Sequence, residues 1–97
     1  MLLKMGVDIS RLERPIRRAL NHIEKVFQKY GVEPVVTSTY EGNHSPGSLH
    51  YADLAVDVRI RGFSQVNQIF GELRERLGAE YDIVLEYEHI HVEWDVG

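Results

Sequence analysis

The chain has 97 residues, with 15 acidic and 11 basic side chains, a formal net charge of −4 and a pI near 5.7. This length fits one domain, spanning residues 1–97, and is too short for a second. An acidic chain lacks the basic face that nucleic-acid binders normally present, so we expect no nucleic-acid partner. The absence of cysteine excludes both disulfides and thiolate metal ligands.

The apolar content of the chain is 43%, and it includes five tyrosines, three phenylalanines and one tryptophan. That is enough for a modest core. The apolar part of the first ten residues is too short for a secretory signal, and no apolar run approaches the roughly 20 residues that span a bilayer. We therefore expect a soluble monomer without membrane contact and without a targeting signal, which is compatible with the cytoplasm.

Two segments have the apolar periodicity of helices, at about residues 9–30 and 64–77. The first stripe consists of Leu12, Ile16, Ala19, Leu20, Ile23, Phe27 and Tyr30. The second consists of Val66, Ile69, Phe70, Leu73 and Leu77. Because proline is tolerated only in the first turn of a helix, Pro15 moves the start of the first regular helix toward Leu12 or Arg14.

Short polar residues and glycines mark the expected ends of both helices. Asp8 or Ser10 can cap the first helix, and Gly31 stands where a left-handed glycine ends it. Ser64 can cap the second helix, and Gly78 ends it in the same way.

Four segments are predicted to be strands: residues 35–39, 54–60, about 81–85 and 89–94. The second of these alternates cleanly, with apolar residues on one face and Asp57 on the other. The order helix–strand–strand–helix–strand–strand predicts an α+β domain. In it, two helices pack on one side of a small antiparallel or mixed sheet.

Four of the five histidines lie in one loop or on the last strand: His44, His50, His89 and His91. The loop, residues 41–48, is dense in turn formers, and it is followed almost directly by His50. His50 and Asp57 can converge if the chain turns at residues 51–53. His91 would then arrive on the same polar face from a neighbouring strand.

This combination of side chains favours a metal site. Imidazole and carboxylate ligands together suit zinc, and three protein ligands with one open position are typical of a catalytic zinc site. We therefore predict a zinc ion bound by His50, Asp57 and His91. The alternative is a polar strand face with loop histidines and no metal. The other acids of this region, including Glu93, are interpreted as solvated.

Two motifs carry a resemblance to a known family. Residues 48–57, Ser-Leu-His-Tyr-Ala-Asp-Leu-Ala-Val-Asp, resemble the S-x-H-x-x-G-x-A-x-D motif of the D-alanyl-D-alanine carboxypeptidase and dipeptidase family of zinc peptidases. Residues 89–91, His-Ile-His, resemble that family's H-x-H, whose second histidine completes the zinc site. The Hedgehog signalling domain shares this peptidase fold and resembles the chain at residues 48–51, at His44 and again at the H-x-H. The likeness extends over about residues 35–94.

The resemblance implies the same three zinc ligands and a glutamate as general base. Glu88, three residues before His91, matches the E-x-x-H placement in the dipeptidase members. Glu86 is the rival, because Hedgehog places its glutamate farther upstream. His89 and His44 would flank the metal, polarising the attacking water or stabilising the oxyanion.

The activity implied is hydrolysis of peptidoglycan stem or cross-bridge peptides by a bacterial or phage-borne zinc metallopeptidase. Two positions depart from the family pattern: Asp53 replaces the motif glycine, and Glu41 follows Tyr40 where many members place an arginine that holds the substrate's carboxylate. The second departure favours an endopeptidase over a strict D-Ala-D-Ala carboxypeptidase, with Arg59 on the same strand face as Asp57 as a substitute anchor. The alternative function is a catalytically inactive, Hedgehog-like zinc-binding interaction module.

Overall fold

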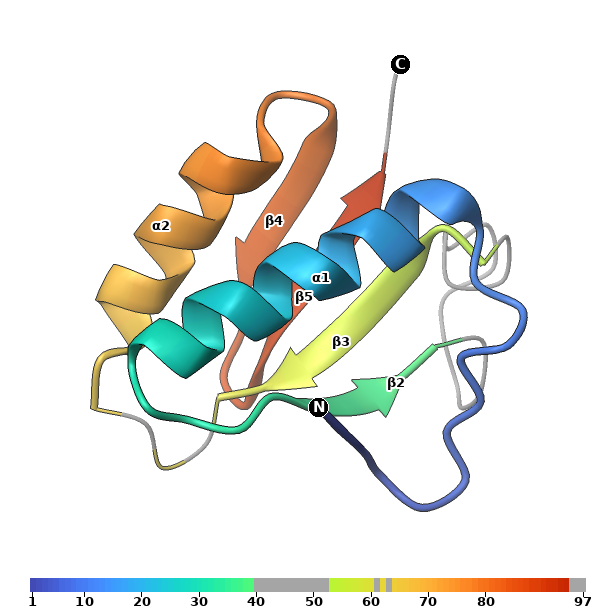
Figure 1. Cartoon of the computed structure of the whole chain (residues 1–97), viewed down its shortest axis with the longest axis horizontal. Helices are drawn as coiled ribbons and strands as arrows, with labels where there is room; N and C mark the ends of the chain where they lie inside the picture. The colour runs from blue at the N-terminus through green and yellow to red at the C-terminus, as the bar shows by residue number, and fades with distance from the viewer. Residues whose placement is uncertain (40–52, 61, 63, 95–97) are drawn as a thin grey trace.

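The computed structural model describes residues 1–39, 53–60, 62 and 64–94 (Figure 1). In chain order the elements are β1 (Leu2–Leu3), α1 (Arg14–Lys29), β2 (Val35–Ser38), β3 (Ala55–Arg59), α2 (Val66–Leu77), β4 (Tyr81–Leu85) and β5 (His89–Trp94). The predicted α+β class is confirmed, and so are both helices and all four predicted strands.

The strands form one mixed five-stranded sheet in the order β1-β2-β3-β5-β4. β1 runs parallel to β2, and the remaining neighbours are antiparallel. The last strand of the chain, β5, therefore lies inside the sheet between β3 and β4. Residues 90–93 of β5 therefore have a register partner on each side.

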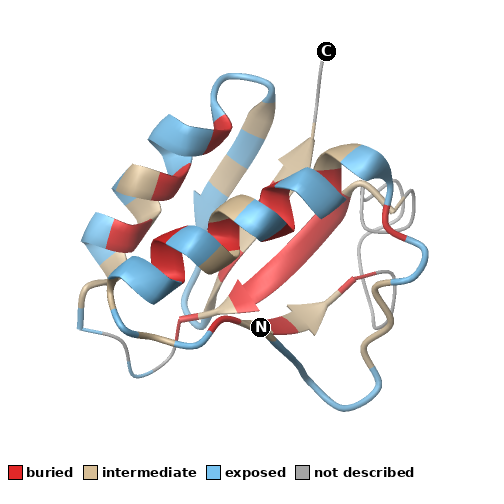
Figure 2. Ribbon diagram, viewed as in Figure 1, coloured by how far each residue is buried: buried red, intermediate tan, exposed pale blue. Residues whose placement is uncertain are grey.

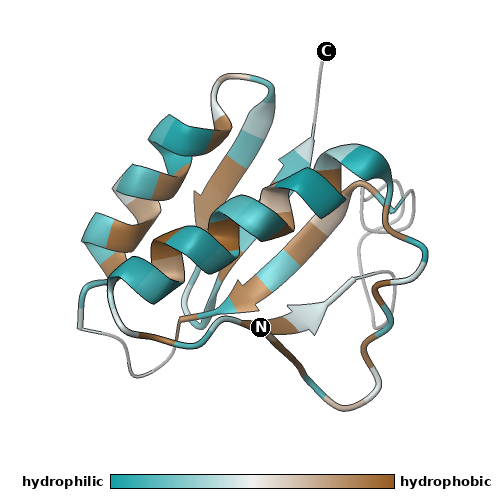
Figure 3. Ribbon diagram, in the orientation of Figure 1, coloured by the Kyte–Doolittle hydropathy of each residue, from teal (hydrophilic) through white to brown (hydrophobic). Residues whose placement is uncertain are grey.

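Both helices cover the same face of the sheet (Figure 1). Their inward residues, which include the fully buried Ile16, Phe27 and Ile69, join Val56 and Val92 of the sheet in one hydrophobic core. Figures 2 and 3 show the same division, with buried and apolar positions on the inner sides of the helices and exposed, hydrophilic positions on their outer sides. In the described part of the chain, neither helix is long and apolar enough to cross a membrane.

The start of α1 follows from Pro15, which lies in the first helical turn where its missing N–H costs nothing. The helix begins at Arg14, and the residue at the N-cap is Glu13, whose side chain makes no capping hydrogen bond. The predicted cap at Asp8 or Ser10 is therefore wrong. The Asp8 carboxylate instead accepts a hydrogen bond from the Ser10 N–H at 2.8 Å, which closes a separate turn ahead of the helix.

The second helix begins at Val66 with Gln65 at the N-cap, so the predicted cap at Ser64 is wrong as well. The predicted C-terminal ends of both helices are confirmed. Gly31 and Gly78 have φ values of +73° and +81°, in the left-handed region that glycine enters without steric cost.

Asp53 also has left-handed backbone, with φ at +61°, and no other non-glycine residue in the described ranges has a positive φ. This is the position where the peptidase motif carries glycine, and aspartate is among the residues that tolerate the conformation best. The turn is held from the helix side, because the Glu13 N–H donates to the Asp53 carbonyl oxygen at 3.0 Å. A turn that suits the motif's glycine is thus present with aspartate in its place.

The strand that sequence reasoning missed is β1. It has only two residues, and it pairs in parallel with Val35 and Val36. The chain continues along the sheet for one more residue, because the Lys4 N–H donates to the Val36 carbonyl oxygen at 2.9 Å. β1 therefore brings Lys4 from the N-terminus to the sheet.

Candidate metal centre

The face of the sheet opposite the helices carries polar side chains from adjacent strands. Core residues alternate with these polar ones along β3 and β5. In the register of the two strands, Asp57 lies opposite His91 and Arg59 lies opposite His89. The predicted polar faces of these two strands are therefore the same face of the sheet, as the metal-site hypothesis requires.

At the centre of this face, His91 is held between two carboxylates. Its Nδ1 lies 2.8 Å from Oδ1 of Asp57, and its Nε2 lies 2.7 Å from Oε1 of Glu93. Because a carboxylate only accepts hydrogen bonds, both ring nitrogens must donate, and the ring is an imidazolium in the metal-free protein. The hydrogen bond to Asp57, with a smaller contribution from Glu93, raises the pKa of His91 from 6.5 to about 9 against the opposing effect of burial.

The first histidine of the H-x-H motif, His89, lies between two carboxylates at longer distances than His91 does. The His89 Nε2 lies 3.2 Å from Oε1 of Glu86 and 3.7 Å from Oδ1 of Asp57. The Glu86 N–H also donates to the His89 carbonyl oxygen at 2.9 Å, where the hairpin between β4 and β5 closes. This pairing directs the Glu86 side chain toward the face that carries His91.

Three of these side chains can hold a metal ion together. One ligand atom from each of Asp57, Glu86 and His91 lies within 4.8 Å of the other two. In a tetrahedral site with bonds of about 2.0–2.1 Å, neighbouring ligand atoms lie about 3.3 Å apart. The 2.8 Å between His91 Nδ1 and Asp57 Oδ1 is close to that spacing, so a cation can take the place of the proton with a small movement. The donor set fits a divalent metal ion, while one nitrogen and two oxygens leave its identity open.

The structure thus brings together two of the three predicted zinc ligands, Asp57 and His91. The third ligand, His50, and the predicted flanking histidine, His44, lie outside the described residues. Of the two candidate bases, Glu86 belongs to the metal cluster. Glu88 lies in the turn between β4 and β5 and lines a hollow beside that cluster.

One acid was misinterpreted from the sequence. Glu93 was expected to be solvated, but its carboxylate accepts the second hydrogen bond of His91 and its side chain is only 24% exposed. The signal was present in the strand period of two, which places Glu93 on the same face as His91 and His89. On a strand, an acid two residues from a predicted ligand lies on the same face and is therefore a candidate member of the site.

The hollow beside the cluster has a volume of about 420 Å³ and opens on the same face of the sheet. It is lined by Lys4, Thr37, Ser38, Asp57, Arg59, Glu88 and His89. Asp57 belongs to the cluster and His89 contacts it, so a molecule in the hollow would lie against the cluster. The N-terminal part of this lining could not be anticipated from the sequence, because it depends on β1.

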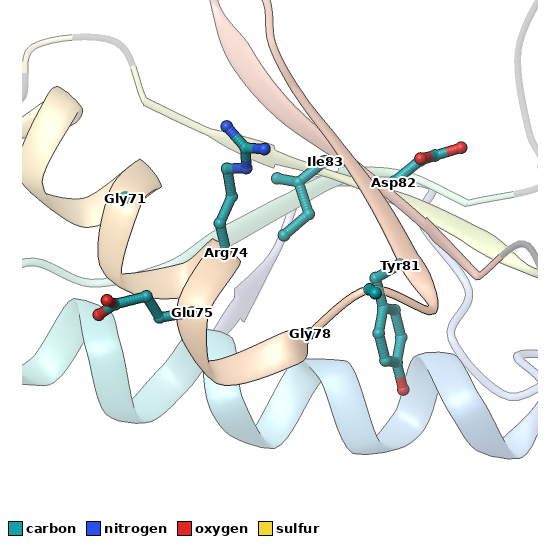
Figure 4. Close-up of a pocket in the computed structure, with 8 residues that line it drawn as sticks. Gly71, Arg74, Glu75, Gly78, Tyr81, Asp82 and Ile83 are labelled. Atoms are coloured by element: carbon teal, nitrogen blue, oxygen red, sulfur yellow. The ribbon is translucent and has the colours of Figure 1, made fainter.

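A larger hollow of about 660 Å³ lies between α2 and β4, on the side of the sheet that carries the helices (Figure 4). Figure 4 shows Arg74 and Ile83 beside it and the Tyr81 hydroxyl turned toward α1, where it donates to the Pro15 carbonyl oxygen at 2.8 Å. This hollow shares no residue with the metal cluster and has no histidine in its lining. Volume alone therefore does not make it the candidate site.

No protein-family model matches the chain, and no curated protein matches its sequence significantly. The residues that point to a function are therefore those of the two motifs and of the sheet face that carries Asp57 and His91.

Proposed function

We propose that the chain is a zinc-dependent metallopeptidase that hydrolyses stem or cross-bridge peptides of peptidoglycan, with a fold like that of the D-Ala-D-Ala peptidases and the Hedgehog domain. One observation carries the proposal. Asp57 and His91, which two separate motifs nominate as zinc ligands, lie 2.8 Å apart on one sheet face with a glutamate, Glu86, in the same cluster. Two motifs far apart in the sequence that meet at one point are unlike a chance arrangement of surface acids and histidines.

In this proposal His50, Asp57 and His91 hold the zinc ion. When bound, zinc supplies Lewis acidity, which activates a water molecule at neutral pH and polarises the peptide carbonyl. His91 must lose a proton to become a ligand, because both of its nitrogens carry one in the metal-free protein. Zinc binding would therefore replace a proton on one ring nitrogen of His91.

The chain's own chemical task is proton transfer. Water adds to the carbonyl carbon of the scissile peptide, and the C–N bond then breaks to give a carboxylic acid and an amine. We assign the general base to Glu86, since its carboxylate lies in the metal cluster and can take a proton from the water and pass it to the leaving amine. His89, at 3.2 Å from that carboxylate, orients it. Glu88 remains the second candidate for the base.

The test compares two matched variants with wild type. Purified, zinc-loaded protein is incubated with muropeptides at neutral pH, and mass spectrometry identifies the bond that is cut. General-base catalysis contributes about 10²–10⁴ in rate, so Glu86→Gln should lower hydrolysis by that order while Glu88→Gln lowers it much less. Zinc content and thermal unfolding, measured for both variants, separate loss of catalysis from loss of metal or fold.

The reverse pattern, with activity lost only in Glu88→Gln, would transfer the base to the residue three positions before His91. Wild-type protein that binds one zinc ion but cleaves no peptidoglycan fragment would contradict the peptidase proposal. The Hedgehog-like interaction module, which binds zinc without catalysis, would then be the better account.

A further inference from the structure

β4 forms one edge of the sheet, and in the described part of the chain no strand covers its outer side. It comes last in the strand order and pairs with β5 alone among the described strands. The Glu86 N–H donates to the carbonyl oxygen of His89, directly opposite it. Because inward and outward backbone groups alternate in an antiparallel ladder, the N–H and C=O groups of Ile83 and Leu85 point away from β5. A further strand could bond to them.

This edge lacks most of the features that keep edge strands from pairing. β4 is as long as β3, and it contains no proline, glycine or lysine. Two of its apolar side chains are exposed, Val84 at 48% and Leu85 at 37%. The opposite edge differs, because β1 has only two residues. β4 is therefore the edge of the sheet that suits an added strand.

Two hollows lie between β4 and α2, one beside each half of the strand. The larger, of about 660 Å³, reaches Ile83 (Figure 4). The smaller, of about 450 Å³, reaches Leu85 and is also lined by Ile60 and Val66. Ile83 and Leu85 are on the helix side of the sheet, since each pairs with a core residue of β5. The residues of an added strand that lie opposite these two would direct their side chains into the hollows.

The lining of the two hollows is acidic. Its one cation is Arg74, against four carboxylates, those of Glu75, Asp82, Glu86 and Glu88. Glu86 pairs with His89 at 3.2 Å, which leaves three carboxylates against Arg74. Along β4 itself, Asp82 and Glu86 flank the exposed Val84 on the face opposite the helices. Cations opposite Asp82 and Glu86 on an added strand would therefore be favoured.

A second copy of the chain is a poorer match for this edge than a basic segment. Each copy has a net charge of −4. Antiparallel pairing of two β4 strands about Val84 would place Asp82 of each copy opposite Glu86 of the other. Like charges directly opposite one another destabilise a strand pair. A basic segment would bring opposite charge to the same positions.

We propose that the outer edge of β4 binds an extended segment of a partner protein in which apolar and cationic side chains alternate. The segment pairs antiparallel to β4, which is the more stable arrangement per residue. Its apolar side chains lie opposite Ile83 and Leu85 and enter the hollows beside α2. Its cationic side chains lie opposite Asp82 and Glu86 on the other face. This interaction does not depend on the peptidase function.

Acetylated peptide amides provide the probes, with the complete chain as the binding protein. The parent peptide is Lys-Val-Lys-Val-Lys-Val-Lys, and a second peptide has glutamate in place of every lysine. Two further forms of the parent are N-methylated, one on its valines and one on its lysines. In the proposed arrangement the valine N–H groups face β4 and the lysine N–H groups face solvent. Binding is followed by NMR through the amide signals of Ile83 and Leu85 and their hydrogen exchange.

We expect saturable shifts and slower hydrogen exchange at both amides with the parent peptide and with the lysine-methylated form. Methylation of the valines removes hydrogen bonds to β4 and should weaken binding at least about tenfold. The glutamate peptide should bind more weakly than the parent. Asp82→Asn should weaken binding of the parent about two- to fivefold, as for an exposed ion pair. Glu33→Gln is the control and should have no effect, since Glu33 precedes β2, which β3 and β5 separate from β4.

Equal binding of the two methylated peptides would overturn the proposal, and so would shifts that leave Ile83 and Leu85 unaffected. Analytical ultracentrifugation tests the second copy as the occupant. A dimer in which both amides are protected without any peptide would assign the edge to self-association and likewise overturn the proposal. None of these measurements requires peptide hydrolysis. Failure here therefore leaves the peptidase function standing, and a chain that cleaves nothing can still bind the segment.

Discussion

The two carboxylates that hold His91 should make the stability of the metal-free protein depend on pH in a defined way. Nδ1 and Nε2 of His91 donate to Asp57 and Glu93, and these bonds raise the pKa of the ring from 6.5 to about 9. Since the folded-state pKa lies above the unfolded one, the imidazolium stabilises the fold. That contribution is fully present below pH 6.5 and disappears as the pH rises to about 9.

The size of the effect follows from the same pair of values. One pKa unit corresponds to about 1.4 kcal/mol, so a change from 6.5 to about 9 amounts to about 3 kcal/mol of unfolding free energy. The ring is only 15% exposed, which limits screening by solvent. His91→Gln removes the titrating group but keeps a side chain of similar size that can still donate one hydrogen bond.

The measurement is urea unfolding of wild type and His91→Gln from pH 6 to pH 9.5, with a chelator present throughout. The advantage of wild type over the variant should shrink by about 3 kcal/mol across this range. The pKa of the Met1 amine is raised by hydrogen bonds to Glu33 and Glu24, but these contacts are the same in both proteins, so their contribution cancels. His22→Gln removes a half-buried histidine of α1 that lies 3.4 Å from Arg76 Nη1, so it is the control and should not reproduce this loss.

A constant difference between wild type and His91→Gln from pH 6 to pH 9.5 would refute the reasoning. It would mean that His91 titrates alike in the folded and unfolded chain, and that the contacts with Asp57 and Glu93 do not hold a proton on the ring.

Two further predictions follow from the same structure. Zinc binding at pH 7 should release about one proton, because the ion replaces a proton on His91. Calorimetry in buffers of different ionisation enthalpy measures the number of protons released. Release of no proton would show that His91 is not a ligand. At Asp53, where φ is +61°, Asp53→Gly should change the unfolding free energy by less than about 1 kcal/mol, whereas Asp53→Val should lower it by about 1–3 kcal/mol. Equal urea midpoints for these two variants would contradict the left-handed turn.

Most of the fold could be predicted because its elements have a clear period. The bounds of β4 and β5 agree with the prediction, and Pro15 correctly indicated the start of α1. The predicted caps failed because a side chain such as Asp8 has local hydrogen-bonding alternatives that the sequence does not rank. β1 was missed because a strand of two residues has no period to detect.

The candidate site was predicted in its outline and not in its details. Alternation along β3 and β5 placed Asp57 and His91 on polar faces, and the strand register then put them opposite one another. Alternation could not decide between Glu86 and Glu88, because that choice depends on where the hairpin turns. It also could not place Lys4, which reaches the site only through pairing between segments far apart in the chain.

The position of β5 has a consequence for how the site is assembled. β5 pairs with β4 as a hairpin and also with β3, which comes before α2 in the sequence. Asp57 therefore belongs to the part of the sheet that is synthesised first, whereas Glu86 and His91 belong to the hairpin that is synthesised last. A metal ion bound by Asp57 and His91 would tie these two parts together, so it would oppose any partial opening that detaches the hairpin. In this arrangement the metal ion would also stabilise the pairing of the hairpin with β3.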